Sequence, residues 1–553
     1  MLKIPLSPKM RFCCVQALGL TSLFLATVAQ GTLPGPPGEA PVTVIDLHAH
    51  VFNAHDLPLA GLLNALGAPL GVNVALAKVI NAATVDDLDG PMPNVVSPLT
   101  LTSEGMGEEF LKNAQSRSGD PDLSSLFAVL RPEERDQLFE FVGESSDPEL
   151  EKLNALKGVE LEVEVLTRAM AKIGFPPEEH GEKKSDELSL KANLPGYLSF
   201  LGVMMNGNLR IARQLESTEY PAVDLFIHHM MDMEKAYAAK PVVPFSQQVT
   251  RMAKLDRRFG GKFLHFTAYD PFRGEDALPS VIRGLKAGAI GVKFYPPSGY
   301  SAVNNQLPPK PSRFKPGSRK RWFSRYENLD AAQLDSLNEK LFAYCETHSI
   351  PIFTHCTPSG FEADDGYGGM ANPKYWAVVL KKHKKLRLCF GHAGGHSYWF
   401  PAATPNVVEK AEADFGEQVV NLCLEYPHVY CEVAYLDQIL SEAGKTAFKA
   451  KLASVIDKPS KDGTWKFGNK LMYGSDWHMI HKEPRHKEYP QAFNGLFTDA
   501  PLKRWQRAFF ARNALDYLEF KKVIEKPWVT KDQKKYWQQL MTDSAAGPAS
   551  GTE

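Results

Sequence analysis

The sequence lacks two features that would assign it to a specialised class of protein, a large excess of one charge and a long apolar run after the N-terminal segment. Its 63 Lys and Arg against 64 Asp and Glu leave a net charge of −1, so nothing attracts it generally to nucleic acid or to an anionic membrane. Beyond residue 31 no apolar run is long enough to cross a bilayer. With 44% hydrophobic and 23% charged residues, the chain can build an ordinary globular core. We therefore expect a small-molecule partner and no nucleic acid, and the sequence leaves a homo-oligomer open.

Cysteine is also scarce, with seven in 553 residues. Cys13 and Cys14 lie near the N-terminus, and the other five are an odd, widely spaced set that does not resemble a disulfide framework. Most of these five occur within apolar strand or helix patterns, which predicts buried, small hydrophobic side chains. They are Cys345, Cys356, Cys389, Cys423 and Cys431.

Residues 1–31 have the pattern of an export signal peptide. Lys3, Lys9 and Arg11 form a positive segment before an apolar run that ends in the small-x-small triplet AQG. We expect the mature protein to be periplasmic or secreted and to keep no stable membrane span. The alternative is an uncleaved anchor, because the apolar run is near the lower length limit for a bilayer span.

Strand-like and helix-like segments alternate from about residue 220 onward. Such alternation predicts a parallel sheet, and VTVIDLHAH near the N-terminus brings the number of predicted strands to eight. Eight β/α units predict a closed (β/α)8 TIM barrel, here built from residues 42–53 and 221–525. The predicted strands are 42–50, 224–230, 263–270, 289–295, 350–356, 386–395, 428–434 and 470–476.

Three segments lie outside this repeat. Residues 54–220 form a large, mainly helical insertion after the first strand, either a lid or pocket wall at the barrel mouth or a separate domain with no part in the site. The Pro-rich basic segment 305–325 follows the fourth strand and is either a solvated loop or a lid that attracts an anionic substrate. Residues 526–553 form a C-terminal extension predicted to be disordered in part.

Side chains that can bind metals end most of the predicted strands. In a barrel the carboxyl ends of the strands meet at one rim, where active sites are built. The two histidines of the first strand are two residues apart, so both can face the barrel axis and bind one ion. Histidine and aspartate provide the ligands that zinc or manganese prefers. The set is His48, His50, Lys293, His355, His392 and Asp476.

This arrangement resembles the amidohydrolase superfamily, which carries HxH on strand one, Lys on strand four, His on strands five and six, and Asp on strand eight. The motifs IDLHAH, THC, GHAGG and YGSDWH resemble its amidohydrolase-related branch, which includes aminocarboxymuconate-semialdehyde decarboxylase and several lactonases. RNALDYLEF (512–520) resembles the helix that closes the barrel in that branch. The resemblance covers residues 42–520 apart from the insertion.

The resemblance implies a divalent metal site with one or two ions, zinc first and manganese or iron as alternatives. His48, His50 and His355 would be metal ligands. Asp476 would bind the metal or its water and act as general base. His392 would bind a second metal or polarise the substrate.

Lys293 allows two interpretations. In binuclear members of the superfamily the strand-four lysine is carbamylated and bridges two metals, but a protonated lysine cannot bind a metal. The alternative is a cationic Lys293 that pairs with a substrate carboxylate or with Asp476. A mononuclear site of His48, His50, His355 and Asp476 is slightly favoured.

The expected reaction is hydrolysis of a C–O or C–N bond in an amide, lactone or ester by metal-activated water. One alternative is nonoxidative decarboxylation, in which a carbon is protonated as CO2 leaves. Another is a non-catalytic binding protein with a relic site, which the complete ligand set argues against. The candidates for substrate binding are Arg273, Tyr295, Tyr300 and His396.

Several other residues near the strand ends receive weaker predictions. His228 and His229 end the second strand, where packing or support of a ligand is the expected role. His478 and His481 follow the eighth strand and are expected near the pocket. Cys356 follows His355 and should point away from it, which indicates a structural residue and not a nucleophile.

Overall fold

The computed structural model describes residues 32–35, 40–93, 103–143, 156–174, 196, 198–306, 329–364, 366–402 and 405–545. The predicted signal peptide lies outside the described residues, as do all but two residues of the basic segment 305–325 and the last eight residues of the chain. No helix in the described part combines the length and apolarity that a bilayer crossing requires.

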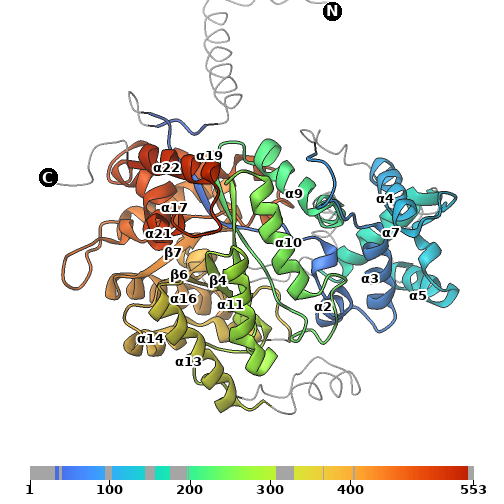
Figure 1. Cartoon of the computed structure of the whole chain (residues 1–553), viewed down its shortest axis with the longest axis horizontal. Coiled ribbons are helices and arrows are strands. Elements are labelled where there is room, and N and C mark those ends of the chain that lie inside the picture. The colour runs from blue at the N-terminus through green and yellow to red at the C-terminus, as the bar shows by residue number, and fades with distance from the viewer. Residues whose placement is uncertain are drawn as a thin grey trace, which may run out of the picture.

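Eight parallel strands form one sheet in the order β1 to β8, so each strand pairs with its neighbours in the sequence. All eight coincide with predicted strands, and every strand residue is buried. The predicted TIM barrel is therefore confirmed (Figure 1). The strands are β1 (Ile45–Ala49), β2 (Leu225–His229), β3 (Phe263–Tyr269), β4 (Gly291–Phe294), β5 (Ile352–Thr354), β6 (Leu388–Phe390), β7 (Val429–Val433) and β8 (Leu471–Tyr473).

The last strand closes the barrel onto the first through backbone and side-chain hydrogen bonds. The N–H of Asp476 donates to the carbonyl of His48 at 2.6 Å. The buried carboxyl of Asp46 accepts from the N–H of Ser475 at 3.0 Å and from its hydroxyl at 2.5 Å. Because these bonds join the ends of β1 and β8, they also bring His48 next to Asp476.

A β-bulge in β1 turns its histidines toward the barrel axis. Asp46 pairs with Phe226 and Ala49 pairs with His228. Between these two pairs the chain advances three residues along β1 but only two along β2. Leu47 and His48 lie within the bulge, and both face the barrel interior. Neighbours on a regular strand would point to opposite sides. Bulges commonly re-aim side chains in this way near functional sites.

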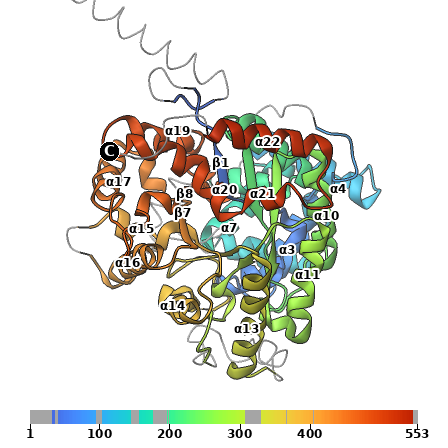
Figure 2. The same ribbon diagram turned by 60° about the vertical axis from the view of Figure 1, so that its left-hand side comes forward.

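The end of the barrel opposite the strand carboxyl ends is filled by apolar side chains and covered by the C-terminal helices α20 (Asn513–Tyr517), α21 (Phe520–Val523) and α22 (Lys531–Ala545) (Figure 2). The Tyr517 hydroxyl donates to the carbonyl of Ile352 at 2.8 Å, and the Trp537 indole donates to the carbonyl of Gly261 at 2.7 Å. Part of the predicted C-terminal extension is thus a packed helix. The pocket described below opens at the other end.

The outer layer consists of helices that connect successive strands (Figure 1). Short helices also follow the strand ends around the pocket. The connecting helices are α10 (Phe245–Arg258), α11 (Ala277–Ala287), α13 (Ala331–His348), α14 (Pro373–Lys382), α16 (Val407–Glu425) and α17 (Glu442–Val455). The short ones are α15 (His396–Trp399), α18 (Trp477–Ile480) and α19 (Tyr489–Asn494).

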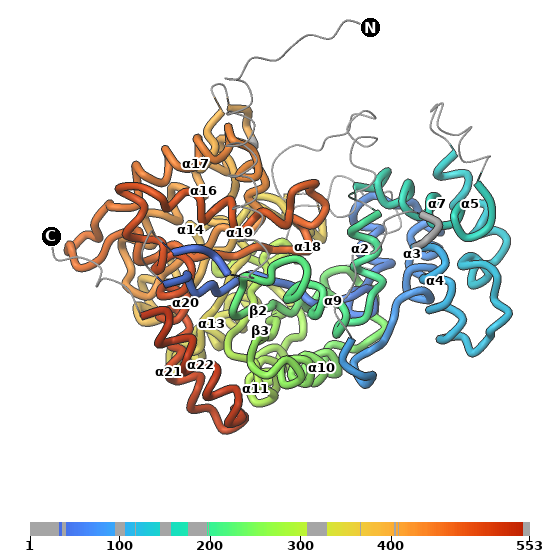
Figure 3. The backbone as a smooth tube through the Cα atoms, turned by 90° about the horizontal axis from the view of Figure 1, so that it is seen from above, coloured from blue at the N-terminus to red at the C-terminus, as the bar shows by residue number. Residues whose placement is uncertain are grey.

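The insertion between β1 and β2 is helical in its described parts, as predicted. Figure 3 shows α2, α3, α4, α5 and α7 grouped beside the barrel, with α9 between this group and the strands. The insertion is fastened to the end of β1, because the Asn53 amide donates to the carbonyls of Val85 at 3.2 Å and Asn206 at 3.0 Å. Its helices are α2 (Leu59–Ala65), α3 (Val72–Ala83), α4 (Ser103–Ser118), α5 (Pro132–Gly143), α7 (Gly158–Lys172) and α9 (Asn208–Gln214).

Candidate metal centre

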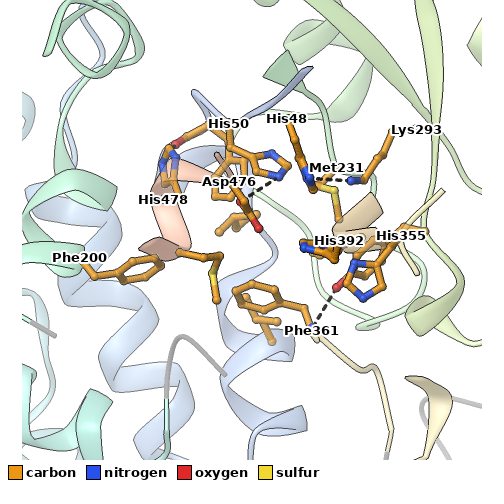
Figure 4. A pocket seen from close by; sticks show the side chains of 16 residues that line it. His48, His50, Phe200, Met231, Lys293, His355, Phe361, His392, Asp476 and His478 are labelled. Atoms are coloured by element: carbon orange, nitrogen blue, oxygen red, sulfur yellow. Dashed lines mark hydrogen bonds and ion pairs between the residues drawn. The ribbon is translucent and has the colours of Figure 1, made fainter. Parts of the chain in front are cut away.

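A pocket of about 490 Å³, counting its solvent-open part, lies at the carboxyl ends of the strands. It brings together all six residues that the sequence analysis placed at strand ends (Figure 4). Three residues of the insertion, Leu57, Leu62 and Phe200, also line it, so the insertion forms part of the pocket wall. The polar lining residues are His48, His50, Lys293, Tyr295, His355, His392, Asp476 and His478.

Three of these side chains are close enough to share one ion. Ligand atoms of His48, His392 and Asp476 all lie within 4.8 Å of one another, and all three residues are at most 2% exposed. His50 adjoins this group, with its Nε2 3.6 Å from Oδ1 of Asp476. Two imidazole nitrogens and a carboxylate oxygen are a donor set that suits zinc.

Hydrogen bonds on the far side of the rings determine which nitrogen can bind a metal. Nδ1 of His50 lies 2.9 Å from the carbonyl of His229, and Nδ1 of His392 lies 3.1 Å from the carbonyl of Ala434. A carbonyl only accepts, so each Nδ1 carries the proton and each Nε2 has a lone pair. Metal-binding histidines commonly have this arrangement.

Glu432 provides the same support for His48, and the sequence analysis missed it. One of its oxygens, Oε1, lies 2.9 Å from Nδ1 of His48 and accepts from the backbone N–H of His392, also at 2.9 Å. Glu432 is fully buried on β7, and burial raises its pKa well above the usual range. A Cβ at Gly474 would lie 2.3 Å from Oε2 of Glu432, so only glycine leaves room for this carboxyl. A glutamate inside the apolar run HVYCEVA was the available signal.

Burial also favours the neutral form of the candidate ligand histidines. It lowers the pKa of both His48 and His50 well below the ordinary value, and the nearby Lys293 ammonium lowers each further. A neutral imidazole is the form that can bind a metal.

Two of the candidate residues have an unusual backbone conformation. His392 has φ 56° and Asp476 has φ 47°, the left-handed region that non-glycine residues rarely adopt. His392 lies two residues after the end of β6, Asp476 lies three residues after the end of β8, and α18 begins after Asp476. Such strain is concentrated at functional sites, where the surrounding structure maintains it. Here it turns the chain so that both side chains stay at the rim.

Lys293 is the next-to-last residue of β4 and lies beside His48. Its Nζ lies 3.1 Å from Nε2 of His48 and 4.3 Å from the centre of the Phe353 ring, and the residue is 1% exposed. The lysine therefore faces the nitrogen of His48 that is available to a metal. This position suits either interpretation from the sequence, a bridging ligand after carbamylation or a cation for a substrate carboxylate.

His355 lines the pocket but is turned differently from the other histidines. Its Nε2 donates to the carbonyl of Ser359 at 2.8 Å and also lies 2.9 Å from the Thr357 hydroxyl. Its ring centre lies 4.8 Å from that of His392. In this arrangement only Nδ1 of His355 carries a lone pair, so it borders the group of three ligands and is not one of them.

Of the four residues proposed to bind substrate, only Tyr295 lines the pocket, where its hydroxyl accepts from the N–H of Phe361 at 2.9 Å. The structure does not bring the other three into the lining, because each is held by a partner elsewhere. The Tyr300 hydroxyl donates to the carbonyl of Tyr269 at 3.0 Å. Arg273 donates to Asp232 at 2.8 Å, and Nε2 of His396 lies 3.0 Å from Asp437.

Of the other histidines near the strand ends, some lie at the pocket and some are held elsewhere. His229 lies beneath the site, with its ring centre 5.0 Å from that of His48. His228 points to the outside of the barrel and pairs with Asp256 of α10 at 2.8 Å. His478 lines the pocket, whereas His481 lies 2.7 Å from the Ser199 hydroxyl of the insertion. Cys356 and the other four described cysteines are buried and free, as predicted.

Comparison with solved structures gives distant similarities. An amidohydrolase from Burkholderia multivorans with bound zinc is 10% identical, over 58% of this chain and 91% of that one, with a TM-score of 0.36. An amidohydrolase from Mycobacterium avium subsp. paratuberculosis is 16% identical, over 61% and 80%, with a TM-score of 0.31. An uncharacterised TIM-barrel protein from Bordetella bronchiseptica is 13% identical, over 60% and 85%, with a TM-score of 0.29.

Comparison with protein families is more direct. No curated protein matches the chain. Residues 230–520 match the family model described as amidohydrolase, and this match spans more than half of the chain, from the end of β2 through the closing helix α20. The protein therefore belongs to the amidohydrolase family.

Proposed function

We propose that the protein is a metal-dependent hydrolase that uses water to cleave a C–O or C–N bond of a small molecule. The observation that carries this proposal is the group of His48, His392 and Asp476, with ligand atoms within 4.8 Å of one another. Hydrogen bonds from Nδ1 of each histidine, to Glu432 and to the carbonyl of Ala434, place the lone pair of each ring on Nε2. The family match supports the same assignment.

These residues fit a divalent metal ion, with zinc favoured by their mixture of nitrogen and oxygen donors and manganese or iron as alternatives. His48, His392 and Asp476 would hold it, and His50 and Lys293 adjoin the same space. When bound, a divalent ion supplies Lewis acidity that polarises a carbonyl group and lowers the pKa of water to about 7.

The chain's own residues account for the proton transfers of hydrolysis. The Asp476 carboxylate takes a proton from the attacking water, whose oxygen forms a bond to the acyl carbon. The C–O or C–N bond then breaks, and the same carboxyl returns the proton to the departing oxygen or nitrogen. Nε2 of His50, 3.6 Å from Asp476, brings a further lone pair to the same space.

A second candidate function is nonoxidative decarboxylation, which the position of Lys293 favours. Its ammonium lies at the base of the pocket, 3.1 Å from His48, where it would pair with a substrate carboxylate. In that reaction the bond between carbon and the carboxylate breaks, CO2 leaves, and the carbon takes a proton from Asp476. The two reactions share a site and differ in product.

We also propose that the protein acts outside the cytoplasm, which the positive and apolar pattern of residues 1–31 supports. A fusion of residues 1–40 to a reporter that is active only after export tests this directly. Export of the fusion, with loss of export when the apolar run is interrupted by charges, is the expected result.

The test of the reaction is turnover by Asp476→Asn, with the metal supplied. We expect kcat/KM to fall by about 10²–10⁴-fold, because the amide keeps the shape of the side chain but cannot accept the proton. Asp437→Asn changes an aspartate outside the pocket lining and serves as the matched control. Full turnover by Asp476→Asn would remove Asp476 from the mechanism. Release of CO2 without hydrolysis would select the second candidate.

A further inference from the structure

The pocket has two chemically different halves. His48, His50, Lys293, His392 and Asp476 gather at the strand ends, whereas Phe200 and Phe361 lie away from Lys293 and His48 (Figure 4). Half of the sixteen lining residues are Phe, Leu or Met side chains. The reacting group of a ligand would therefore contact polar side chains, and the rest of the ligand would contact apolar ones.

The apolar half is built by separate segments of the chain. Phe52 and Leu62 follow β1, Phe200 comes from the helical stretch at 198–205, Met231 follows β2, and Phe361 follows β5. These side chains from separate loops form the apolar side of the pocket, called the apolar wall below. Met233 and Met479 extend the wall with flexible thioether side chains, which adapt to apolar groups of different shape.

The cations near the pocket do not reach this apolar wall. Among the described residues that line the pocket, Lys293 is the only Lys or Arg, and it lies beneath His48 at the polar end. Arg273 is outside the lining and is held by Asp232 and Glu234 at 2.8 and 3.4 Å. A carboxylate or phosphate placed against the wall would lose its hydration without gaining a partner, which is costly.

We propose that the substrate is a neutral ester or lactone with an uncharged alkyl or aryl group that packs against the apolar wall, while its carbonyl lies at the polar end. This inference rests on the proposed hydrolase function. Water adds to the carbonyl carbon, the bond from that carbon to the alkyl or ring oxygen breaks, and that oxygen takes the proton held by Asp476. The products are one carboxylic acid and one alcohol group. The pocket volume of about 490 Å³ lies within the range of small-molecule sites.

The first experiment measures kcat/KM of the metal-loaded enzyme for 4-nitrophenyl acetate, butyrate and hexanoate, and for the 4-nitrophenyl monoester of succinate. Each added methylene should raise kcat/KM about fourfold until the wall is covered, because burial of a methylene favours binding to that extent. The succinate monoester, with a carboxylate at the far end, should be at least tenfold worse than the butyrate. A preference for the succinate ester would overturn the proposal.

Two variants test whether the preference for longer acyl chains arises from the apolar wall. Phe200→Ala should reduce the gain in kcat/KM from butyrate to hexanoate, because it removes a part of the wall that the longer acyl chain covers. Phe139→Ala removes a phenylalanine of the insertion that is 38% exposed and outside the pocket, and it should behave as wild type. An equal loss on all three esters in Phe200→Ala would contradict a role in binding the chain of the substrate.

A binding measurement separates the substrate class from the reaction. By calorimetry, 4-phenylbutan-2-one should bind the metal-loaded protein at least tenfold more tightly than the same ketone with a para-carboxylate. If the ketones show this order but no ester or lactone is cleaved, the apolar wall is supported and hydrolysis is wrong. If esters are cleaved but the charged ketone binds as well as the neutral one, the substrate class is wrong and the hydrolase stands.

Discussion

The barrel contains two buried clusters of histidine and aspartate side chains, one at the pocket and one under helix α10. His228, Asp256 and His265 form the second, and their ligand atoms lie as close together as those of the first. In it, the two oxygens of Asp256 bond to His228 at 2.8 Å and to His265 at 2.6 Å. The carboxylate is thus satisfied by its own histidines, which lower its pKa to about 2 against the effect of burial.

The cluster at the pocket is arranged in the opposite way. His48 and His392 direct their Nδ1 atoms away from Asp476, toward Glu432 and the carbonyl of Ala434. Their Nε2 atoms then face the pocket together with the Asp476 carboxylate. The comparison teaches that proximity of potential ligands does not define a metal centre. A group of ligands can bind a metal when the histidines form their hydrogen bonds to partners outside the group, and not when they form them to the carboxylate within it.

The largest effect on stability should come from breaking the closed cluster. Asp256→Asn removes a buried charge from between two histidines and should lower the free energy of unfolding by about 3–5 kcal/mol. Metal content of the folded fraction should not change, because the Asp256 carboxylate is already paired with both histidines of this cluster. Urea unfolding and elemental analysis of the same sample check both parts. Loss of a bound metal in Asp256→Asn would remove the distinction between the clusters.

A third group extends the comparison, because it joins the insertion to the segment after β8. His481 lies 2.7 Å from the Ser199 hydroxyl, and its Nδ1 lies 3.8 Å from the Glu219 carboxylate. Burial lowers the pKa of His481 from 6.5 to about 4. Between these values the unfolded chain binds a proton that the folded chain does not, so stability falls as pH drops from 6.5 to 4.

The expected loss from this histidine over that interval is about 3 kcal/mol. His481→Gln should flatten the pH dependence of unfolding between pH 6.5 and 4, since glutamine does not titrate there. His348→Gln, at an exposed position, should leave the dependence as in wild type. Urea unfolding at several pH values measures this, and an unchanged slope in His481→Gln would contradict the account.

The smallest of these effects should come from the support of the metal ligand. Glu432→Gln keeps the size of the side chain but weakens the hold on His48, and should reduce metal affinity by about 10–100-fold. Glu412→Gln changes a buried carboxyl on α16, outside the pocket, and serves as the control. Competition with a chelator of known affinity gives the two values. Equal affinities would mean that Glu432 does not position His48.

The sequence predicted the barrel and the six strand-end residues because both depend on local pattern. Apolar runs define the strands, and parallel strands necessarily bring the ends of those runs to one rim. The residues that it misplaced depend on long-range pairing. Arg273 follows a strand as the ligands do, but Asp232 from another loop holds it outside the pocket lining. Nothing near Tyr300 in the sequence indicates that its hydroxyl bonds to Tyr269.

The roles of Glu432 and of the β1 bulge could not be predicted from the sequence, because they also depend on contacts between residues far apart in the chain. A glutamate on a barrel strand is recognisable only as an exception to an apolar run, and its partner His48 lies 384 residues away. The alternation of β1 predicts His48 and His50 on one side, which is correct. The register shift between Asp46 and Ala49 that turns both inward is a property of the pairing with β2.

Metal content per chain, measured by elemental analysis on protein supplied with zinc and manganese, tests the central claim most directly. The comparison needs wild type, His392→Ala in the pocket cluster and His265→Ala in the closed cluster, each confirmed as folded by circular dichroism. We expect at least one ion per chain in wild type and in His265→Ala, and a loss of at least one in His392→Ala. Wild type without metal, or full metal content in His392→Ala, would contradict the account.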